Sequence, residues 1–221
     1  MKIKILRKVM EANDEIAMQI RNLLREKSVL AFNLIGSPGS GKTSLLERTI
    51  EKLKPQLSIA VVEGDIATTR DAERIARLDV PVVQLHTDGE CHLHANLVRQ
   101  SLSDLNLEDI DILFIENVGN LVCPVEFDIG EFAKVGVLSV AEGDDKPLKY
   151  PLLFRKSGCI VLNKIDLLPY VNFERTQFYS DIEKIDSTLK VIEVSCRTGE
   201  GIEDWVIWIQ EMQSKCVKRE E

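Results

Sequence analysis

Hydrophobic residues form seven short continuous runs, which alternate with longer stretches where apolar residues recur every three or four positions. The continuous runs predict strands buried on both faces, and the longer stretches predict amphipathic helices. The alternation therefore predicts an α/β fold, a mostly parallel central sheet with helices on both faces. The predicted strands are 29–35, 58–63, 81–85, 111–116, 135–140, 159–163 and 189–194. The predicted helices between them are 42–54, 69–77, 92–104, 147–156, 174–186 and 201–214.

One more amphipathic helix is predicted ahead of the sheet. Its apolar positions, spaced between charged residues over 8–28, are Val9, Ala12, Ile16, Ile20, Leu23 and Leu24. This spacing puts them on one face of a helix. The length of 221 residues suits one α/β domain and is short for two. We therefore expect an N-terminal helix over 1–28, one domain over 29–214 and a frayed tail over 215–221.

A glycine-rich segment, Gly36-Ser-Pro-Gly-Ser-Gly-Lys-Thr43, lies between a predicted strand and a predicted helix. It fits the P-loop pattern, because glycines let successive backbone N–H groups turn toward phosphate oxygens and the helix start adds partial positive charge. Lys42 would reach the β- and γ-phosphates, and the Thr43 hydroxyl would bind Mg²⁺. The alternative is an ordinary glycine turn. The nucleotide-binding residues expected here are Gly36, Gly39, Ser40, Gly41, Lys42, Thr43 and Ser44.

A second motif, Asn163-Lys-Ile-Asp166, comes at the end of the predicted strand 159–163 and matches the Asn-Lys-x-Asp signature of GTP-binding proteins. The Asp166 carboxylate would accept hydrogen bonds from guanine N1–H and the 2-amino group, two donors that adenine lacks. Asn163 would brace the loop, and the stem of Lys164 would cover one face of the base. The alternative is a polar turn after a strand. Following a P-loop, the motif predicts that the ligand is GTP or GDP.

The segment Ser195-Cys-Arg-Thr-Gly199 follows the last predicted strand. It resembles the loop of small residues that closes over the guanine in GTPases, where a backbone N–H points at O6. Cys196 would then lie beside the base and need not be a metal ligand. An ordinary turn into the last helix is the alternative.

Carboxylates at two further strand ends fit the magnesium side of such a site. Glu116 ends the strand 111–116 and Gly119 follows three residues later, which resembles an Asp-x-x-Gly element with Glu in place of Asp. The Gly119 N–H would sense the γ-phosphate. Asp65 begins a predicted switch segment over 65–72; the alternative makes Asp65 and Asp71 helix caps. We expect Lys42, Asp65 and Glu116 to be catalytic, and Thr43, Asp65 and Glu116 to hold Mg²⁺.

The chain lacks a glutamine where many GTPases hold their catalytic water. Intrinsic hydrolysis is therefore expected to be slow, on the order of minutes or longer per turnover.

Two segments carry candidate ligands for a softer metal ion. Cys91-His-Leu-His94 and Cys123 each follow a predicted strand, so both would reach one edge of the sheet. Thiolate and imidazole suit Zn²⁺ or Ni²⁺. On a regular helix Cys91 shares a face with His94, whereas at a helix start Cys91 with His92 can chelate. Structural roles for these residues are the alternative.

Composition narrows the class of partner. A net charge of −8 and a pI near 5.1 argue against general nucleic-acid or membrane-surface binding. With no long apolar run and no signal-peptide pattern, we expect a cytoplasmic protein. Five scattered cysteines are then expected to be thiols or ligands.

Together these segments resemble the HypB hydrogenase maturation GTPases, a nickel-inserting class of P-loop GTPases. The resemblance covers about residues 30 to 205. The segments that carry it are Gly36–Thr43, Glu63–Arg74, Cys91–Ala95, Glu116–Pro124, Phe127–Glu131 and Asn163–Asp166. The related urease accessory GTPases are less similar over Glu116–Pro124.

The resemblance implies GTP hydrolysis with Mg²⁺ and nickel delivery to a [NiFe]-hydrogenase large-subunit precursor. It implies a GTP-dependent homodimer and a HypA-type accessory protein as partners. It assigns Ni²⁺ or Zn²⁺ to Cys91, His92 and Cys123 at the dimer interface, with His94 a bystander or an extra ligand. Some members carry an N-terminal cysteine-rich nickel motif, but the first cysteine here is Cys91. Transfer is therefore expected at the internal site or from the partner.

Other readings remain open from the residues alone. One is a regulatory GTPase switch in which the Cys and His residues are structural and no metal binds. Another is a urease-type nickel accessory GTPase, and a third is a P-loop kinase acting on a small molecule.

Overall fold

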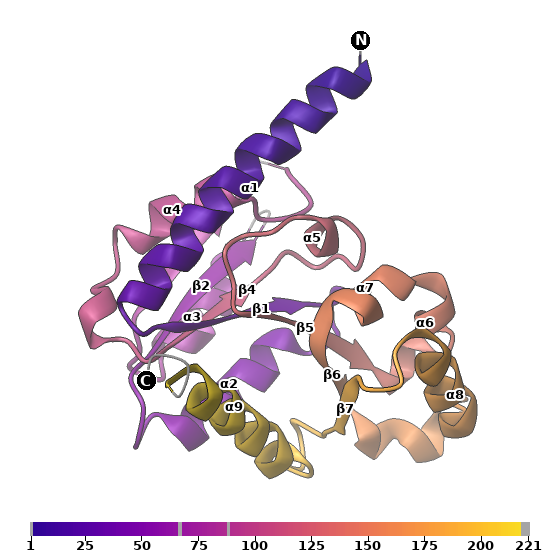
Figure 1. Ribbon diagram of the computed structural model, residues 1–221. Coiled ribbons are helices and arrows are strands. Elements are labelled where there is room, and N and C mark those ends of the chain that lie inside the picture. The colour runs from indigo at the N-terminus through magenta and orange to yellow at the C-terminus, as the bar shows by residue number, and fades with distance from the viewer. Residues whose placement is uncertain (1, 66–67, 88, 218–221) are drawn as a thin grey trace.

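The computed structural model describes residues 2–65, 68–87 and 89–217 (Figure 1). Within these residues a seven-stranded sheet runs in the order β3-β2-β4-β1-β5-β6-β7, with every neighbouring pair parallel. All of the predicted strands form, and the predicted α/β class is confirmed. The strands are β1 Leu30–Ile35, β2 Ile59–Asp65, β3 Val82–His86, β4 Ile112–Glu116, β5 Ala133–Ser139, β6 Ser157–Asn163 and β7 Lys190–Glu193.

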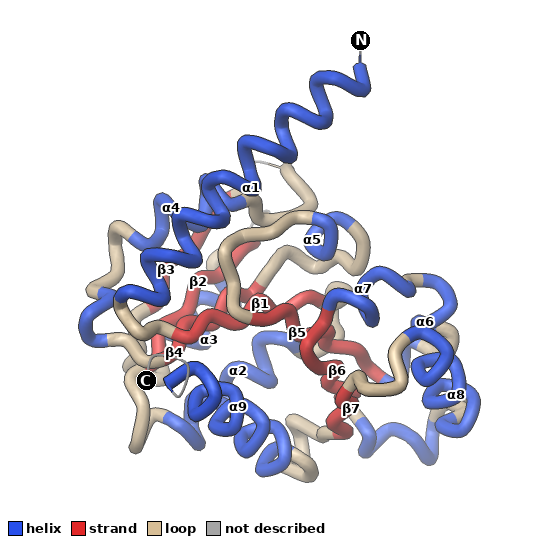
Figure 2. The backbone as a smooth tube through the Cα atoms, in the orientation of Figure 1, coloured by secondary structure: helices blue, strands red, loops and turns tan. Residues whose placement is uncertain are grey.

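Helices cover both faces of this sheet, which lies between them in Figure 2. Short 3₁₀ turns occupy Leu107–Asp109, Val140–Glu142 and Ile165–Tyr170. The α-helices are α1 Lys2–Glu26, α2 Lys42–Leu53, α3 Arg70–Ala76, α4 Ala95–Leu102, α5 Cys123–Glu126, α6 Lys146–Lys149, α7 Pro151–Lys156, α8 Arg175–Ile185 and α9 Ile202–Val217.

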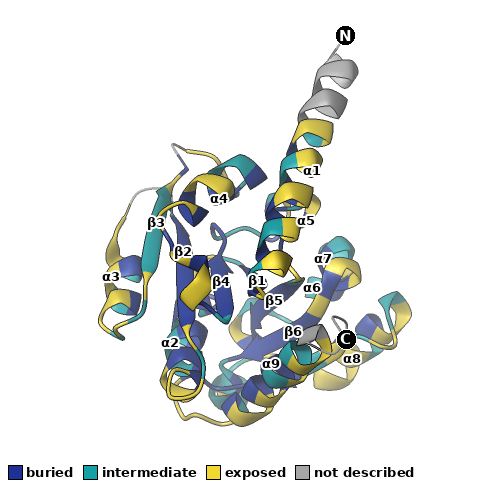
Figure 3. Cartoon of the chain, turned by 60° about the vertical axis from the view of Figure 1, so that its left-hand side comes forward, coloured by how far each residue is buried: buried dark blue, intermediate teal, exposed yellow. Residues whose placement is uncertain are grey.

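Alternate residues along each strand enter different hydrophobic clusters. In β1 and β4, Phe32 and Phe114 stack with ring centroids 5.8 Å apart and pack under α2 and α9. Ala31 and Leu113 point the other way, into a cluster shared with α1 and α4. Because both faces are apolar, the central strands are almost wholly buried (Figure 3). The polar residues at their carboxyl ends are therefore held on a rigid platform.

The structure adds the short helix α5, which was not predicted, and differs from the predicted helices at several ends. The helix expected over 147–156 is broken into α6 and α7, because Pro151 has no N–H to continue a helix and is suited to begin one. The helix expected from residue 92 begins at Ala95, since the side chain of His94 caps it by accepting from the Leu97 N–H at 3.4 Å. α9 continues to Val217, into the predicted tail; residues 218–221 lie outside the described residues.

The predicted N-terminal helix is present and runs from Lys2 to Glu26, so it begins ahead of the amphipathic pattern at 8–28. Its first turns project beyond the body of the molecule (Figure 1). Ala17, Ile20 and Leu24 anchor its second half in the cluster beside α4. The division at residues 28 and 214 stays a prediction. None of the described helices has the length and hydropathy that a membrane crossing needs.

Candidate functional site

The glycine-rich segment forms a tight loop between β1 and α2. Gly39 and Gly41 have φ values of 77° and 99°, in the left-handed region that glycine adopts without strain. Gly41 precedes α2, whose first residues are Lys42 and Thr43. The Lys42 ammonium lies back over the loop, 3.3 Å from the Gly36 carbonyl oxygen. This places the ammonium and the start of the helix around one concave surface, as an anion site requires.

The carboxylates at the ends of β2 and β4 lie next to this loop. Thr43 Oγ1 donates to Glu116 Oε1 at 2.9 Å, and Lys42 Nζ is 4.0 Å from the same oxygen. Glu63 is the register partner of Glu116 on the neighbouring strand, and both are nearly fully buried. Burial raises the pKa of both carboxyls, and the proximity of Glu116 raises that of Glu63 further.

Orphaned oxygens in this pair suit a divalent cation. Glu63 Oε2 and Glu116 Oε2 are buried without a hydrogen-bond partner. Asp65 lies at the rim, where its Oδ2 accepts from Thr68 Oγ1 at 2.6 Å. Hard oxygen ligands of this kind fit Mg²⁺. The residues expected at the ion, Thr43, Asp65 and Glu116, thus line one pocket of about 440 Å³ together with Lys42 and Gly119.

Glu63 lies deeper in this pocket than Asp65, and no role was predicted for it. A charged residue inside an otherwise apolar strand was the available signal. Residues 66 and 67 of the predicted switch segment lie outside the described residues. Asp71 lies in the first turn of α3 and pairs with Arg74 at 2.9 Å.

Asn163 braces the other end of the pocket. Its Nδ2 donates to the Ser40 carbonyl oxygen at 3.0 Å, and its Oδ1 accepts from the backbone N–H groups of Lys164 and Cys196. Lys164 Nζ donates to the Gly39 carbonyl oxygen at 2.7 Å. One side chain therefore joins the phosphate loop to both segments that were expected to hold the base.

Asp166 faces an adjoining pocket of about 610 Å³, lined also by Ser44, Asn163, Lys164 and Cys196. Its Oδ1 accepts from Ser195 Oγ at 2.6 Å, which orients the carboxylate. Burial raises the pKa of the Cys196 thiol to about 11, so it stays protonated at neutral pH. The structure brings the expected base-side residues together.

Replacing Gly41 with Ala is expected to weaken GTP binding at least about tenfold. The left-handed φ costs a non-glycine residue about 1–2 kcal/mol. In addition, an added Cβ would lie 2.3 Å from Asn163 Nδ2, so Asn163 would have to leave the Ser40 carbonyl. Gly89→Ala is the control, because its φ is +92°, its Cβ would meet open space and it lines neither nucleotide pocket. Equilibrium titration with a fluorescent GTP analogue measures both; equal affinities for the two variants would contradict the expectation.

Cys91, His92 and Cys123 come together in front of β4. One ligand atom from each lies within 4.8 Å of the others, and Cys91 Sγ is 3.7 Å from His92 Nδ1. Hydrogen bonding with Cys123 raises the pKa of the Cys91 thiol, and burial lowers the pKa of His92, leaving a neutral imidazole able to ligate. The His92 ring rests on the Phe127 ring, with centroids 4.0 Å apart. Two sulfurs and one nitrogen at this spacing suit Zn²⁺ or Ni²⁺.

His94 stands apart from this group. Cys91 and His92 precede α4 rather than lying on it, so the helical pairing of Cys91 with His94 does not occur. His94 Nδ1 caps α4 and its Nε2 is 3.5 Å from Glu90 Oε2. The pairing of Cys91 with His92 is the one that the backbone allows.

The loop from β4 to α5 connects the two sites. Gly119 packs so closely on the phosphate loop that an added Cβ would lie 2.9 Å from Pro38 N. Four residues later Cys123 begins α5. Asn120 Nδ2, between them, donates to the Cys91 carbonyl oxygen at 3.2 Å. A shift of this loop at the nucleotide pocket would therefore be felt at both cysteines.

Comparisons with known proteins identify the family and agree with the fold. The family model "CobW/HypB/UreG, nucleotide-binding domain" matches residues 30–193. Hydrogenase maturation factor HypB of Escherichia coli K12 is 44% identical over 91% of this chain and 70% of its own length. The crystal structure of hydrogenase maturation factor HypB from Archaeoglobus fulgidus superposes with a TM-score of 0.86 at 38% identity, over 92% of this chain and 99% of that one.

The crystal structure of HypB from Helicobacter pylori in complex with nickel gives a TM-score of 0.88 at 34% identity, over 92% of this chain and 96% of that one. The resemblance stated from the sequence is thereby confirmed. With a family model over most of the chain and a relative matched over more than two thirds of its length, this chain belongs to the HypB hydrogenase maturation factors of the CobW/HypB/UreG family.

Proposed function

We propose that this chain is a GTP-hydrolysing metallochaperone that binds nickel or zinc and assists nickel insertion into a [NiFe]-hydrogenase precursor. The observation that carries the proposal is the group of Cys91, His92 and Cys123 within 4.8 Å, in which Cys123 ends a loop whose first residues line the nucleotide pocket. Support comes from the HypB of Helicobacter pylori, whose structure was solved with nickel.

Different residues of the pocket bind the phosphates, the Mg²⁺ ion and the guanine. Lys42 and the backbone N–H groups of the glycine loop bind and orient the phosphates, and Gly119 contacts the γ-phosphate. Thr43, Glu116 and Asp65 hold Mg²⁺, with Glu63 behind them; the bound ion supplies positive charge against the phosphate oxygens. Asp166 reads guanine, braced by Ser195. No glutamine is among the described residues that line this pocket, which supports slow turnover.

Metal exchange requires a partner surface. Three protein ligands leave a tetrahedral ion one position short, which a second copy of the chain can fill in a GTP-dependent homodimer. The acidic chain acts in the cytoplasm, exchanging nickel with a HypA-type accessory protein and delivering it to the hydrogenase large-subunit precursor.

Nucleotide state should change nickel affinity, because Gly119 and Cys123 share one loop. We expect the Kd for Ni²⁺ to differ at least about fivefold between the GDP-bound protein and the protein bound to a non-hydrolysable GTP analogue, the lower range of typical allosteric coupling. Competition titrations in both states, with oligomer mass measured alongside, test this. Cys123→Ala protein is the control for nickel bound elsewhere. Equal affinities in the two states would refute the coupling, and absence of nickel or zinc binding would leave a metal-independent GTPase switch.

A further inference from the structure

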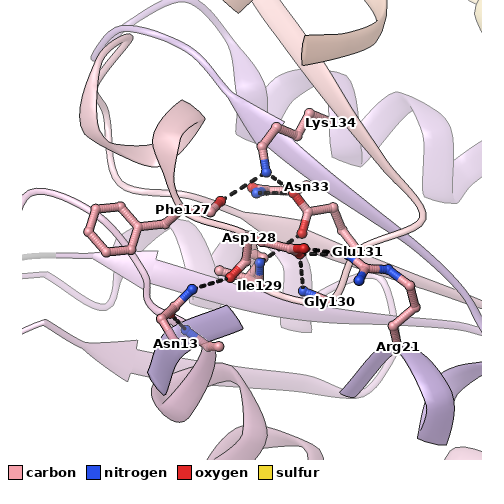
Figure 4. Close-up of polar contacts among 10 residues, drawn as sticks. Asn13, Arg21, Asn33, Phe127, Asp128, Ile129, Gly130, Glu131 and Lys134 are labelled. Carbon is pink, nitrogen blue, oxygen red and sulfur yellow. Dashed lines mark hydrogen bonds and ion pairs between the residues drawn. The ribbon is translucent and has the colours of Figure 1, made fainter. Parts of the chain in front are cut away.

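A buried polar network joins the segments that carry the metal-binding group, and Figure 4 shows the part of it around Asn13, Asn33, Glu131 and Lys134. We use this name for Asn13, Asn33, Asn117, Glu131 and Lys134, each no more than 8% exposed. Polar side chains at this depth lower stability unless their bonds are made. The partners of these hydrogen bonds therefore show which segments of the chain the network holds in place.

The charged half of the network shapes the segment that follows Cys123. Lys134 Nζ pairs with Glu131 Oε1 and donates to the Phe127 carbonyl oxygen at 2.9 Å. Glu131 Oε2 accepts from the Ile129 N–H at 2.9 Å, and its Oε1 accepts from Asn33 Nδ2 on β1. The Glu131–Lys134 pair thus holds residues 127–131 against the sheet. One of them is Phe127, whose ring packs on the His92 ring.

Two asparagines fix the segment that carries Cys91 and His92. Asn117 Oδ1 accepts from the Leu93 N–H at 3.0 Å, and its Nδ2 donates to Asn33 Oδ1. Asn13, on α1, accepts from the Ala95 N–H through Oδ1 at 2.9 Å. This segment is therefore hydrogen-bonded to Asn117, after β4 of the sheet, and to Asn13 on α1.

Asn13 is the one member whose two bonds join both segments directly. While Oδ1 accepts from Ala95 N, Nδ2 donates to the Asp128 carbonyl oxygen at 2.7 Å. An amide can accept and donate at once, whereas alanine can do neither and a carboxylate can only accept. Arg21, two turns further along α1, pairs with the Asp128 side chain at 2.6 Å in a more exposed position.

We propose that Asn13 and the Glu131–Lys134 pair are positioning residues of the metal site, holding the Cys91–His92 segment and the Cys123–Phe127 segment at the spacing that one ion needs. The proposal rests on the proposed metal-binding function and adds α1 to the site. Residues that orient the metal ligands without binding the ion are important for affinity. Removing one typically lowers metal affinity about 10–100-fold. Asn13 acts from a helix that supplies no ligand itself.

The test uses the full chain with Co²⁺ as a spectroscopic probe, whose visible bands report the geometry and number of thiolate ligands. Asn13→Ala is expected to weaken Co²⁺ binding at least about tenfold and to alter these bands. Asn22→Ala is the matched control on α1, because the contact described for Asn22 is an exposed bond from Arg25. GTP-analogue affinity should be unchanged in both variants. In metal-free protein, hydrogen exchange of peptides covering 93–97 and 127–131 should be faster in Asn13→Ala alone.

Asn13→Asp is the second variant, since it keeps the size and the acceptor for Ala95 but loses the donor to Asp128. If either Asn13 variant, folded as judged by its GTP-analogue affinity, binds Co²⁺ with the affinity and spectrum of the unchanged protein, the positioning role is wrong. If the unchanged protein binds no Co²⁺ at these cysteines, the metal function fails as well. A wild-type Co²⁺ titration beside Cys123→Ala separates these two results.

Discussion

Asp166→Asn is expected to convert a guanine-selective site into one that prefers xanthine nucleotides, with GTP affinity reduced by about 100-fold or more. A carboxylate accepts from guanine N1–H and the 2-amino group together. An amide with its NH₂ turned toward the base instead meets the 2-oxygen of xanthine as a donor. The effect is large because a mismatched base leaves buried donors unpaired.

The surroundings of Asp166 make the substitution a clean one. Ser195 Oγ holds Oδ1 at 2.6 Å, and an asparagine oxygen can accept the same bond. Arg197, 83% exposed at its side chain, lies 3.9 Å from the other oxygen and adds little. Affinities for GTP and XTP analogues, with Asp204→Asn on the exposed side of α9 as the control, measure the change. GTP selectivity that survives the substitution would exclude Asp166 from base recognition.

Much of the fold was predictable because parallel strands buried on both faces leave an unmistakable pattern. Each strand is a continuous apolar run, and in parallel sheets the polar residues that follow such runs meet at one edge. Glu116 and Asn163, far apart in the sequence, therefore lie beside the same phosphate loop. The boundaries of α4 were less predictable, because His94 reads as a helical residue until its capping bond is seen.

The buried polar network was beyond prediction for a different reason. Asn33 interrupts the apolar run of β1, and its bond to Glu131 spans 98 positions of sequence. The bond from Asn13 to the Asp128 carbonyl spans 115. The sequence around a single polar residue in an apolar run does not show which residue it will bond. Its role can be seen only in the packed structure. The role of Glu63 was not predicted for the same reason. Glu63 lies beside Glu116 because β2 and β4 are neighbours in the sheet, and this strand order is not evident from the sequence.

Cys91→Ala and Cys123→Ala are each expected to abolish stoichiometric binding of Ni²⁺ or Zn²⁺. We expect metal affinity to fall by more than about 100-fold, which exceeds the loss typical of residues that only orient the ligands. Each change removes a thiolate from a group of three ligands, and the two that remain cannot complete a tetrahedral site. Metal analysis after gel filtration, with and without a GTP analogue, measures the stoichiometry per chain and per oligomer.

Cys159→Ala is the matched control for these losses. Its thiol is fully buried in the core between sheet and helices, where burial raises its pKa to about 12 and keeps it protonated. GTP-analogue binding should survive in both metal-site variants, because the phosphate loop, Glu116 and Asp166 are untouched. Stoichiometric metal retained by a protein that carries both Cys91→Ala and Cys123→Ala would place the ion elsewhere. Loss of metal together with intact nucleotide binding would mean that the nucleotide pocket binds its ligand without the three metal ligands, and that Cys91 and Cys123 serve the metal ion alone.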